Sequence, residues 1–256
     1  MKTKFYFLSA LALCSLAFVS CSDDDSNNPN PQLDTRVRTY VEDSRNIPFG
    51  SLDTMDVTYD ASNRATLISK RNGSFEMNYV YNGTTGYTMT MTEGGAVTLW
   101  QKLMANGMGL VDSTIQSDMP GDSITEKYFY NAASQVIEMR GYDYNSGVST
   151  LSDITRFEYD GNGNRTKEIE LTPMGDTVSV MTTTYSSAVP NWYTSGVQFM
   201  PVVQKNLPVS VTYYDPSTGD TQTSTITYEM DTRNRITKET YTITGFGTYS
   251  KSYIYF

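Results

Sequence analysis

Hydrophobic and polar residues alternate with a period of two along much of the chain after residue 36. In the segment 224–230, for example, Ile226, Tyr228 and Met230 fall on one face of an extended strand, and mostly hydroxyl-bearing residues fall on the other. The segment 155–159 repeats the pattern, with aromatic residues on one face and charged residues on the other. No segment of ten residues shows a convincing helical period. The pattern therefore predicts an all-β fold.

Turn signals separate these short strands. They are Asn72-Gly73, Asn82-Gly83, Asn106-Gly107, Asn145-Ser146-Gly147 and Asp160-Gly161. These residue types adopt positive φ at low cost, which favours tight reversals. Strands joined by short turns pair with their sequence neighbours, so we expect an antiparallel meander of hairpin repeats.

An internal repeat marks several of the turns. An aromatic residue or Met is followed by Asp or Asn, and Arg or Gln opens the next strand, as in Tyr59-Asp60…Arg64, Tyr130-Asn131…Gln135 and Met230-Asp231…Arg235. Tyr159-Asp160…Arg165 has one extra residue. We expect the aromatic ring to face the core, the Asp or Asn side chain to bond to amides two residues on, and the Arg stem to cover neighbouring rings.

These units resemble the YD-repeat or RHS-like units of bacterial surface proteins. The segment Lys205-Asn206-Leu207-Pro208-Val209, with the two strands and the Met230-Asp231 turn that follow it, resembles more closely a family of gut-bacterial lipoproteins of unknown function, described as having a porin-like fold. The resemblance covers residues 53–256, and it implies a barrel-like surface lipoprotein.

A meander of about a dozen strands leaves two edge strands with unpaired backbone N–H and C=O groups unless the sheet closes. We therefore expect residues 36–256 to form a single closed or nearly closed soluble barrel. The C-terminal strand Tyr253-Ile254-Tyr255-Phe256 also resembles the end of integral outer-membrane barrels, which is an alternative. Such barrels need an unbroken apolar outer face, whereas Thr237, Glu239 and Thr242 interrupt it here.

The N-terminus has the features of a secretory leader. Lys2 and Lys4 precede an apolar stretch over residues 5–19, which is shorter than the about 20 residues of a membrane-spanning helix. Phe18-Val19-Ser20-Cys21 resembles a bacterial lipobox, although Phe18 stands where Leu is usual. The resemblance implies that residues 1–20 are a signal peptide and that Cys21 is lipidated. Ordinary secretion, with an unmodified Cys21, is the alternative.

Residues 21–35 follow as a flexible acidic tether, because they are too poor in large apolar residues to fold. The run Ser22, Asp23, Asp24 and Asp25 resembles the export signal of surface lipoproteins from anaerobic gut bacteria; a plain solvated linker is the alternative. We expect an outer-membrane, lipid-anchored and surface-exposed protein whose partner is the membrane itself, through its acyl chains.

Charge and composition exclude several classes of function. The chain has 19 Lys and Arg, 28 Asp and Glu, and no His, for a net charge of −9. Without Lys2 and Lys4 of the leader, 17 cationic residues face 28 acidic ones, a net charge of −11, which argues against nucleic-acid binding. Cys14 leaves with the leader, so no intrachain disulfide forms. The lack of His excludes Ser-His-Asp and Cys-His hydrolysis and His-containing zinc sites, and we expect no metal or cofactor.

Candidate ligand contacts are few. The Pro-rich segment 186–208 contains Trp192 and Tyr193, whose rings suit a sugar face, but the segment can equally cover one end of the barrel. Trp100 is expected in the core. The segment Asp160-Gly161-Asn162-Gly163-Asn164 begins like a calcium loop but lacks the later ligands, and predicts a turn.

The sequence thus favours a non-catalytic binding or structural lipoprotein, with a glycan, a peptide or a protein of a surface complex as its ligand. A glycan hydrolase that works without His is the enzymatic alternative, using paired carboxylates such as Asp118 with Asp122 or Asp215 with Asp220.

Overall fold

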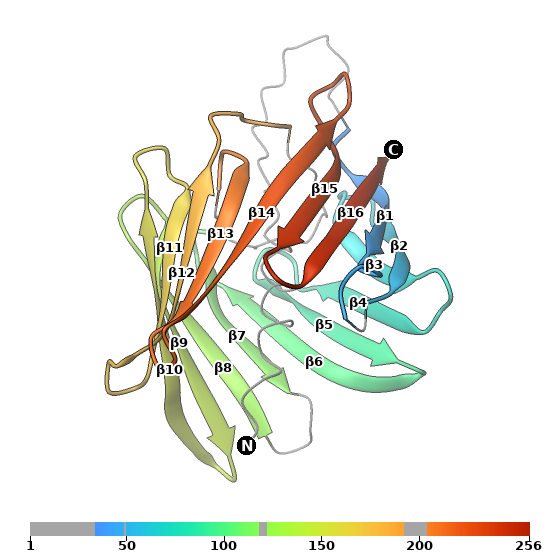
Figure 1. Ribbon diagram of the computed structural model, residues 1–256. Coiled ribbons are helices and arrows are strands. Elements are labelled where there is room, and N and C mark those ends of the chain that lie inside the picture. Colours follow the sequence, from blue (N-terminus) through green and yellow to red (C-terminus); the bar gives the residue numbers. More distant parts are fainter. Residues whose placement is uncertain (1–33, 49, 118–121, 192–203) are drawn as a thin grey trace.

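The computed structural model describes residues 34–48, 50–117, 122–191 and 204–256. These residues form sixteen strands (Figure 1). No helix in this part of the chain is long and apolar enough to cross a membrane. The strands are β1 (Val37–Asp43), β2 (Leu52–Tyr59), β3 (Ala65–Lys70), β4 (Phe75–Tyr81), β5 (Gly86–Glu93), β6 (Ala96–Ala105), β7 (Val111–Ser117), β8 (Asp122–Tyr130), β9 (Val136–Asn145), β10 (Val148–Tyr159), β11 (Arg165–Leu171), β12 (Thr177–Tyr185), β13 (Pro208–Asp215), β14 (Asp220–Met230), β15 (Ile236–Ile243) and β16 (Gly247–Tyr255).

The strands form one closed antiparallel barrel. Each strand pairs with its neighbours in sequence, and β16 pairs with β1 to close the wall (Figure 1). The predicted all-β meander of hairpins and its closure are confirmed. The strand number exceeds the dozen or so expected, because short strands such as β3 alternate poorly and are hard to recognise in the sequence.

The two ends of the barrel differ in their connections. We call the end that holds the links after even-numbered strands the Asx end, because most of these links begin with Asp or Asn. The opposite end, with the links after odd-numbered strands, is called the mouth. Asx-end turns begin at Asp60, Asn82, Asn106, Asn131, Asp160 and Asp231.

Five of the Asx-end turns share one hydrogen-bond pattern. In the first, the Asp60 carboxylate accepts from the backbone N–H groups of Ser62 (2.8 Å) and Arg64 (2.9 Å), as expected for an Asx turn. Asn106, Asn131, Asp160 and Asp231 accept in the same way. The Arg64 guanidinium lies over the ring of Tyr81 at 4.4 Å, as the repeat predicted.

Positive φ falls on the third residue after the Asp or Asn, namely on Asn63, Ser134, Gly163 and Asn234. The expectation that Gly161 and Gly107 take this conformation is wrong; Gly163 and Gly109 take it instead. The reason is that Asp160 and Asn106 act as side-chain acceptors that start the turn, which moves the left-handed residue further along.

Tyrosines add a second repeated bond. Tyr59, Tyr130, Tyr159, Tyr185, Tyr228 and Tyr255, all at or near the ends of even-numbered strands, each donate their hydroxyl to a carbonyl at the start of the preceding strand, at 2.6 to 2.8 Å. Burial raises the pKa of Tyr130 to about 12, so its hydroxyl stays protonated and available as a donor. Each bond ties one hairpin together at the Asx end.

Apolar side chains fill the barrel at the Asx end. The first residues of several odd-numbered strands are almost fully buried, namely Val37, Ala65, Val111, Val136 and Ile236. Larger side chains of β2 to β6 continue this core along the inner wall, among them Met55, Ile68 and Leu103. The buried face of each strand is the inner one, since a closed wall encloses only one face.

The outer face is rich in Thr and in charged residues. Asp56 pairs with Arg71 (2.7 Å), Glu138 with Arg140 (2.7 Å) and Arg156 (3.1 Å). Both Arg71 and Arg156 are well exposed. The outer wall is therefore suited to contact with water.

Candidate functional site

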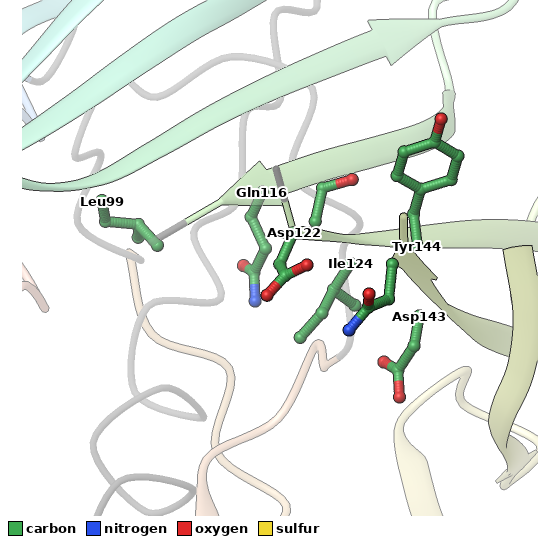
Figure 2. A pocket seen from close by; sticks show the side chains of 8 residues that line it. Leu99, Gln116, Asp122, Ile124, Asp143 and Tyr144 are labelled. Carbon is green, nitrogen blue, oxygen red and sulfur yellow. The ribbon is translucent and has the colours of Figure 1, made fainter. Parts of the chain in front are cut away.

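A pocket of about 270 Å³ opens at the mouth, where β6 and β8 begin and β7 and β9 end (Figure 2). Its lining combines apolar side chains, amides and carboxylates. The residues are Leu99, Gln116, Asp122, Ser123, Ile124, Asp143, Tyr144 and Asn145.

Strand register brings the polar members of the pocket together. Asp122 lies opposite Asn145 and Ile124 lies opposite Asp143 in the β8–β9 pairing. Figure 2 shows the side chains of Asp122 and Asp143 directed to the same side of the sheet, and that of Tyr144 to the other. Two carboxylates from neighbouring strands thus face one concave space.

The inner wall beyond the pocket is also acidic. Glu126 accepts from the hydroxyls of Thr114 (2.8 Å) and Tyr128 (2.7 Å), and Glu170 accepts from Ser179 (2.9 Å). Asp153 accepts from Ser152 at 2.8 Å and fills the space beside Gly141, where a Cβ would clash with its carboxylate. The partners of these acids are hydroxyls and not cations.

The cations of the same strands lie elsewhere. Lys127, Arg140, Arg156 and Lys167 alternate to the outer face, and Arg165 pairs with Glu168 (3.4 Å) at the Asx end. Among the described residues, no group of three or more Asp, Glu, His or Cys side chains is arranged to hold a metal ion.

A second polar cluster spans the seam where β16 meets β1. Glu239 is 3% exposed and accepts from the hydroxyls of Tyr241 (2.9 Å) and Tyr253 (3.1 Å). Lys251 lies opposite Glu239 and pairs with Glu42 at 2.7 Å. Burial raises the pKa of Glu239, although the tyrosine hydroxyls and the charge of Lys251 oppose the shift. This cluster is enclosed, so it suits stabilisation of the seam more than ligand exchange.

Most of the predicted site residues lie outside the described residues. These are Cys21, Ser22, Asp23, Asp24, Asp25, Trp192, Tyr193 and Asp118.

The flanks of the segment 186–208 are described, and they are bound at the Asx end. Asn191 donates to the backbone oxygen of Arg233 (2.7 Å), and Asn206 bonds with Asn164, which is 1% exposed. These flanks therefore lie at the Asx end of the barrel, and the part of the segment between them, residues 192–203, lies outside the described residues.

Two further predictions can be compared with the structure. Trp100 is 36% exposed and lies on the outer face between Thr90 and Ser117, so its placement in the core is wrong. Its neighbours Leu99 and Leu103 face inward instead. Asp215 and Asp220 face each other at the tip of the β13–β14 hairpin, where the Asp215 carboxylate is occupied by Ser217.

The sequence pointed to Asp122 only as half of a carboxylate pair with Asp118, and it did not single out Asp143. The β8–β9 alternation contains the signal, because Asp122, Ile124 and Glu126 share a face. Recognising the site also requires the register that sets Asp143 beside Ile124.

Comparisons with known proteins concern the fold alone. The chain is similar to the crystal structure of a porin-like protein from Bacteroides uniformis ATCC 8492, with a TM-score of 0.59, 14% identity, and coverage of 88% of this chain and 98% of that one. It is also similar to a porin-like protein from Bacteroides vulgatus ATCC 8482, with a TM-score of 0.64, 10% identity, and coverage of 87% and 99%. No protein-family model and no curated protein matches. The barrel thus has the fold of these porin-like proteins.

Proposed function

We propose that the chain is a lipid-anchored, non-catalytic binding protein of the outer membrane, whose barrel takes a small ligand through the mouth. One observation carries the proposal: the apolar core covers the Asx end and the inner wall of β2 to β6, whereas a pocket lined by both polar and apolar residues opens at the mouth between β6 and β9. Concave sites that combine apolar walls with a few polar groups are the usual form of small-ligand sites.

The direction of the chain supports an outward-facing mouth. Strand β1 begins at the Asx end, and Arg235 of the last Asx turn donates to the backbone oxygen of Asp34 at 2.8 Å. A tether over residues 21–35 that starts at a lipidated Cys21 therefore joins the barrel at the Asx end. The mouth then faces away from the membrane, and on an exported protein it is open to the surroundings.

The outer face weighs against the integral barrel. Membrane-spanning barrels carry an apolar outer band about 25 Å tall, whereas Asp56, Arg71, Glu138 and Arg156 form exposed ion pairs on this wall. The porin-like names of the two similar proteins are compatible with either barrel type.

The enzymatic alternative has less support. The paired carboxylates Asp215 and Asp220 sit on an exposed hairpin tip and not in the hollow. Asp122 and Asp143 do share a pocket, but no neighbouring group among the described residues marks either one as a general acid.

Blocking the pocket tests the proposal. Gln116→Trp places a ring in the pocket, whereas Thr225→Trp places one on the exposed outer face of β14 and serves as the control. We expect compounds that raise the melting temperature of the unaltered protein to lose this effect on Gln116→Trp and to keep it on Thr225→Trp. Equal effects on both variants, or no stabilising compound among glycans, peptides and amines, would contradict a binding function of the lumen.

A further inference from the structure

Asn82 begins the Asx-end turn between β4 and β5, but its side chain takes no part in ordering that turn. In five other Asx-end turns, a side-chain oxygen accepts from two backbone N–H groups. Within the described ranges, the exposed carboxamide of Asn82 forms no hydrogen bond. Thr85 closes the turn instead, because its N–H (3.2 Å) and its hydroxyl (2.7 Å) both donate to the backbone oxygen of Asn82. The Asn82 side chain is therefore not held in one orientation.

The backbone N–H of the next residue, Gly83, is also without an acceptor among the residues that the structure describes. Gly83 has a φ of 62°, whereas in the five other turns positive φ falls two residues further along. Glycine adopts this conformation at low cost, and beyond the neighbouring residues nothing lies within 4 Å of the position that a Cβ would take. The Gly83 nitrogen and the Asn82 carboxamide are adjacent in the chain, so two unengaged groups lie side by side at an exposed loop tip.

We propose that Asn82 is a site of spontaneous deamidation. The backbone nitrogen of Gly83 loses its proton to solvent and attacks the side-chain Cγ of Asn82. A C–N bond forms, the bond to the side-chain nitrogen breaks, and this nitrogen takes up a proton and leaves as ammonia, so that a succinimide ring closes. Water then adds to one of the two ring carbonyls and opens the ring to aspartate or isoaspartate. Water is the sole co-reactant, and the reaction does not depend on the proposed binding function.

The Asn-Gly pair at residues 72–73 shows how hydrogen bonds oppose this reaction. The Asn72 side-chain oxygen accepts from the N–H (3.0 Å) and the hydroxyl (2.7 Å) of Ser74. The N–H of Gly73 donates to the backbone oxygen of Lys70 at 2.8 Å. Both reacting groups are engaged, so these bonds must break before the nitrogen can attack.

The two remaining Asn-Gly pairs of the chain each have one reacting group engaged. The Asn106 side-chain oxygen accepts from two backbone N–H groups, at 2.9 and 3.1 Å. In the pair Asn162-Gly163, the N–H of Gly163 donates to the backbone oxygen of Asp160 at 3.0 Å. Asn162 is exposed, as Asn82 is, so hydrogen bonding and not exposure sets Asn82 apart.

Deamidation changes both the charge and the backbone of the turn. Aspartate at position 82 places a carboxylate where Asp60, Asp160 and Asp231 open their own turns. Isoaspartate routes the backbone through the side chain and lengthens it by a methylene group. Either product adds a negative charge, so the chain accumulates a more acidic form as it ages.

Peptide mapping by mass spectrometry tests the inference. One sample of the protein is incubated folded in alkaline buffer, and a second is unfolded in guanidinium chloride, where the Asn-Gly pairs lose their hydrogen bonds. We expect all the pairs to react at similar rates when unfolded. In the folded protein, Asn82 should react about tenfold or more faster than the other pairs, because only their reacting groups must first leave a hydrogen bond within the described structure.

Two variants separate Asn82 from the other sites. Asn82→Gln lengthens the side chain, which disfavours ring closure, and should prevent the acidic form from accumulating in isoelectric focusing. Asn72→Gln, at another exposed turn, is the matched control and should leave the accumulation unchanged. The inference is overturned if another Asn-Gly pair of the folded protein converts as fast as Asn82, or if Asn82 stays intact in the folded protein while the unfolded sample converts. Equal accumulation of the acidic form in Asn82→Gln and in the unaltered protein also overturns it.

Discussion

At the scale of single residues, the Asp or Asn that opens most Asx-end turns accepts the hydrogen bonds that order the turn. Asp231 accepts from the backbone N–H groups of Arg233 and Arg235, both at 2.9 Å, and from the Arg235 guanidinium at 2.8 Å. The same guanidinium lies 4.3 Å from the centre of the Tyr255 ring. One carboxylate therefore orders a turn and positions the cation that covers the neighbouring strand.

Replacing Asp231 by Ala should lower the free energy of unfolding by about 1–3 kcal/mol, because two backbone donors and one guanidinium lose their acceptor. Urea unfolding measures the change. Asp220→Ala is the control, since the Asp220 side chain accepts no hydrogen bond from the described residues. Equal unfolding midpoints for the two variants would show that the turn does not depend on its carboxylate.

Glu239 should make stability depend on pH. Its pKa is raised in the folded protein by burial, so folding favours the protonated acid. The contribution is fully present below the ordinary pKa of about 4.5 and is lost as the pH rises through the folded-state value. The groups around it are Tyr241, Tyr253 and Lys251, and Lys251 also faces Glu42.

We therefore expect the stability of Glu239→Gln, relative to the unaltered protein, to increase between pH 4 and pH 8. Glu229→Gln removes an exposed carboxylate from the neighbouring strand β14 and should show a much smaller change. Urea unfolding over this pH range makes the comparison. Parallel pH profiles for the unaltered protein and Glu239→Gln would contradict the assignment of a raised pKa.

At the scale of elements, the unit is a hairpin closed by a tyrosine and linked to the next hairpin by an Asx turn. The faces of β10 and β14 could be predicted because their residues alternate clearly: Phe157 and Tyr228 face inward, and Arg156 faces outward. Trp100 was expected in the core because large aromatic rings generally favour burial. Side chains alternate along β6, however, and because Leu99 and Leu103 face inward, Trp100 faces outward. The positive-φ positions were misplaced at Gly161 because local propensity does not reveal which residue bonds to which amide.

Asn164 connects elements that are distant in sequence. Its side chain accepts from the backbone N–H groups of Lys205 (2.7 Å) and Asn206 (2.9 Å), and donates to Asp160 (2.9 Å). Replacing it by Ala should cost about 3 kcal/mol, because buried partners lose their bonds. Asn162→Ala, in the same turn but exposed, should cost much less when both are measured by urea unfolding. Equal losses would mean that the contact with residues 205–206 adds little.

At the scale of the whole molecule, closure by β1 and β16 joins the two ends of the domain into one wall without free edges. Apolar side chains fill the Asx end, a pocket opens at the mouth, and the described chain begins at Asp34 beside the Asx end. In the proposed arrangement, the barrel is anchored to the membrane on the side of its Asx end, and its mouth faces away from the membrane.

Cys21→Ala tests how the barrel is attached to the membrane. We expect the variant to leave the membrane fraction and appear in the soluble periplasmic fraction, because acyl chains supply the membrane affinity. Fractionation followed by carbonate extraction measures this, and Cys14→Ala, within the leader, is the control that should stay bound. Retention of the Cys21→Ala barrel after carbonate treatment would favour the integral alternative.

The sequence by itself determined the strand-rich class, the inward and outward faces of the clearest strands and the Asx turns. These features depend on alternation and on hydrogen bonds between residues a few positions apart. Only the tertiary structure decided the sixteen-strand closure, the exposure of Trp100 and the meeting of Asp122 with Asp143. Those features depend on register between strands and on the pairing of β1 with β16, which the order of residues within one segment does not specify.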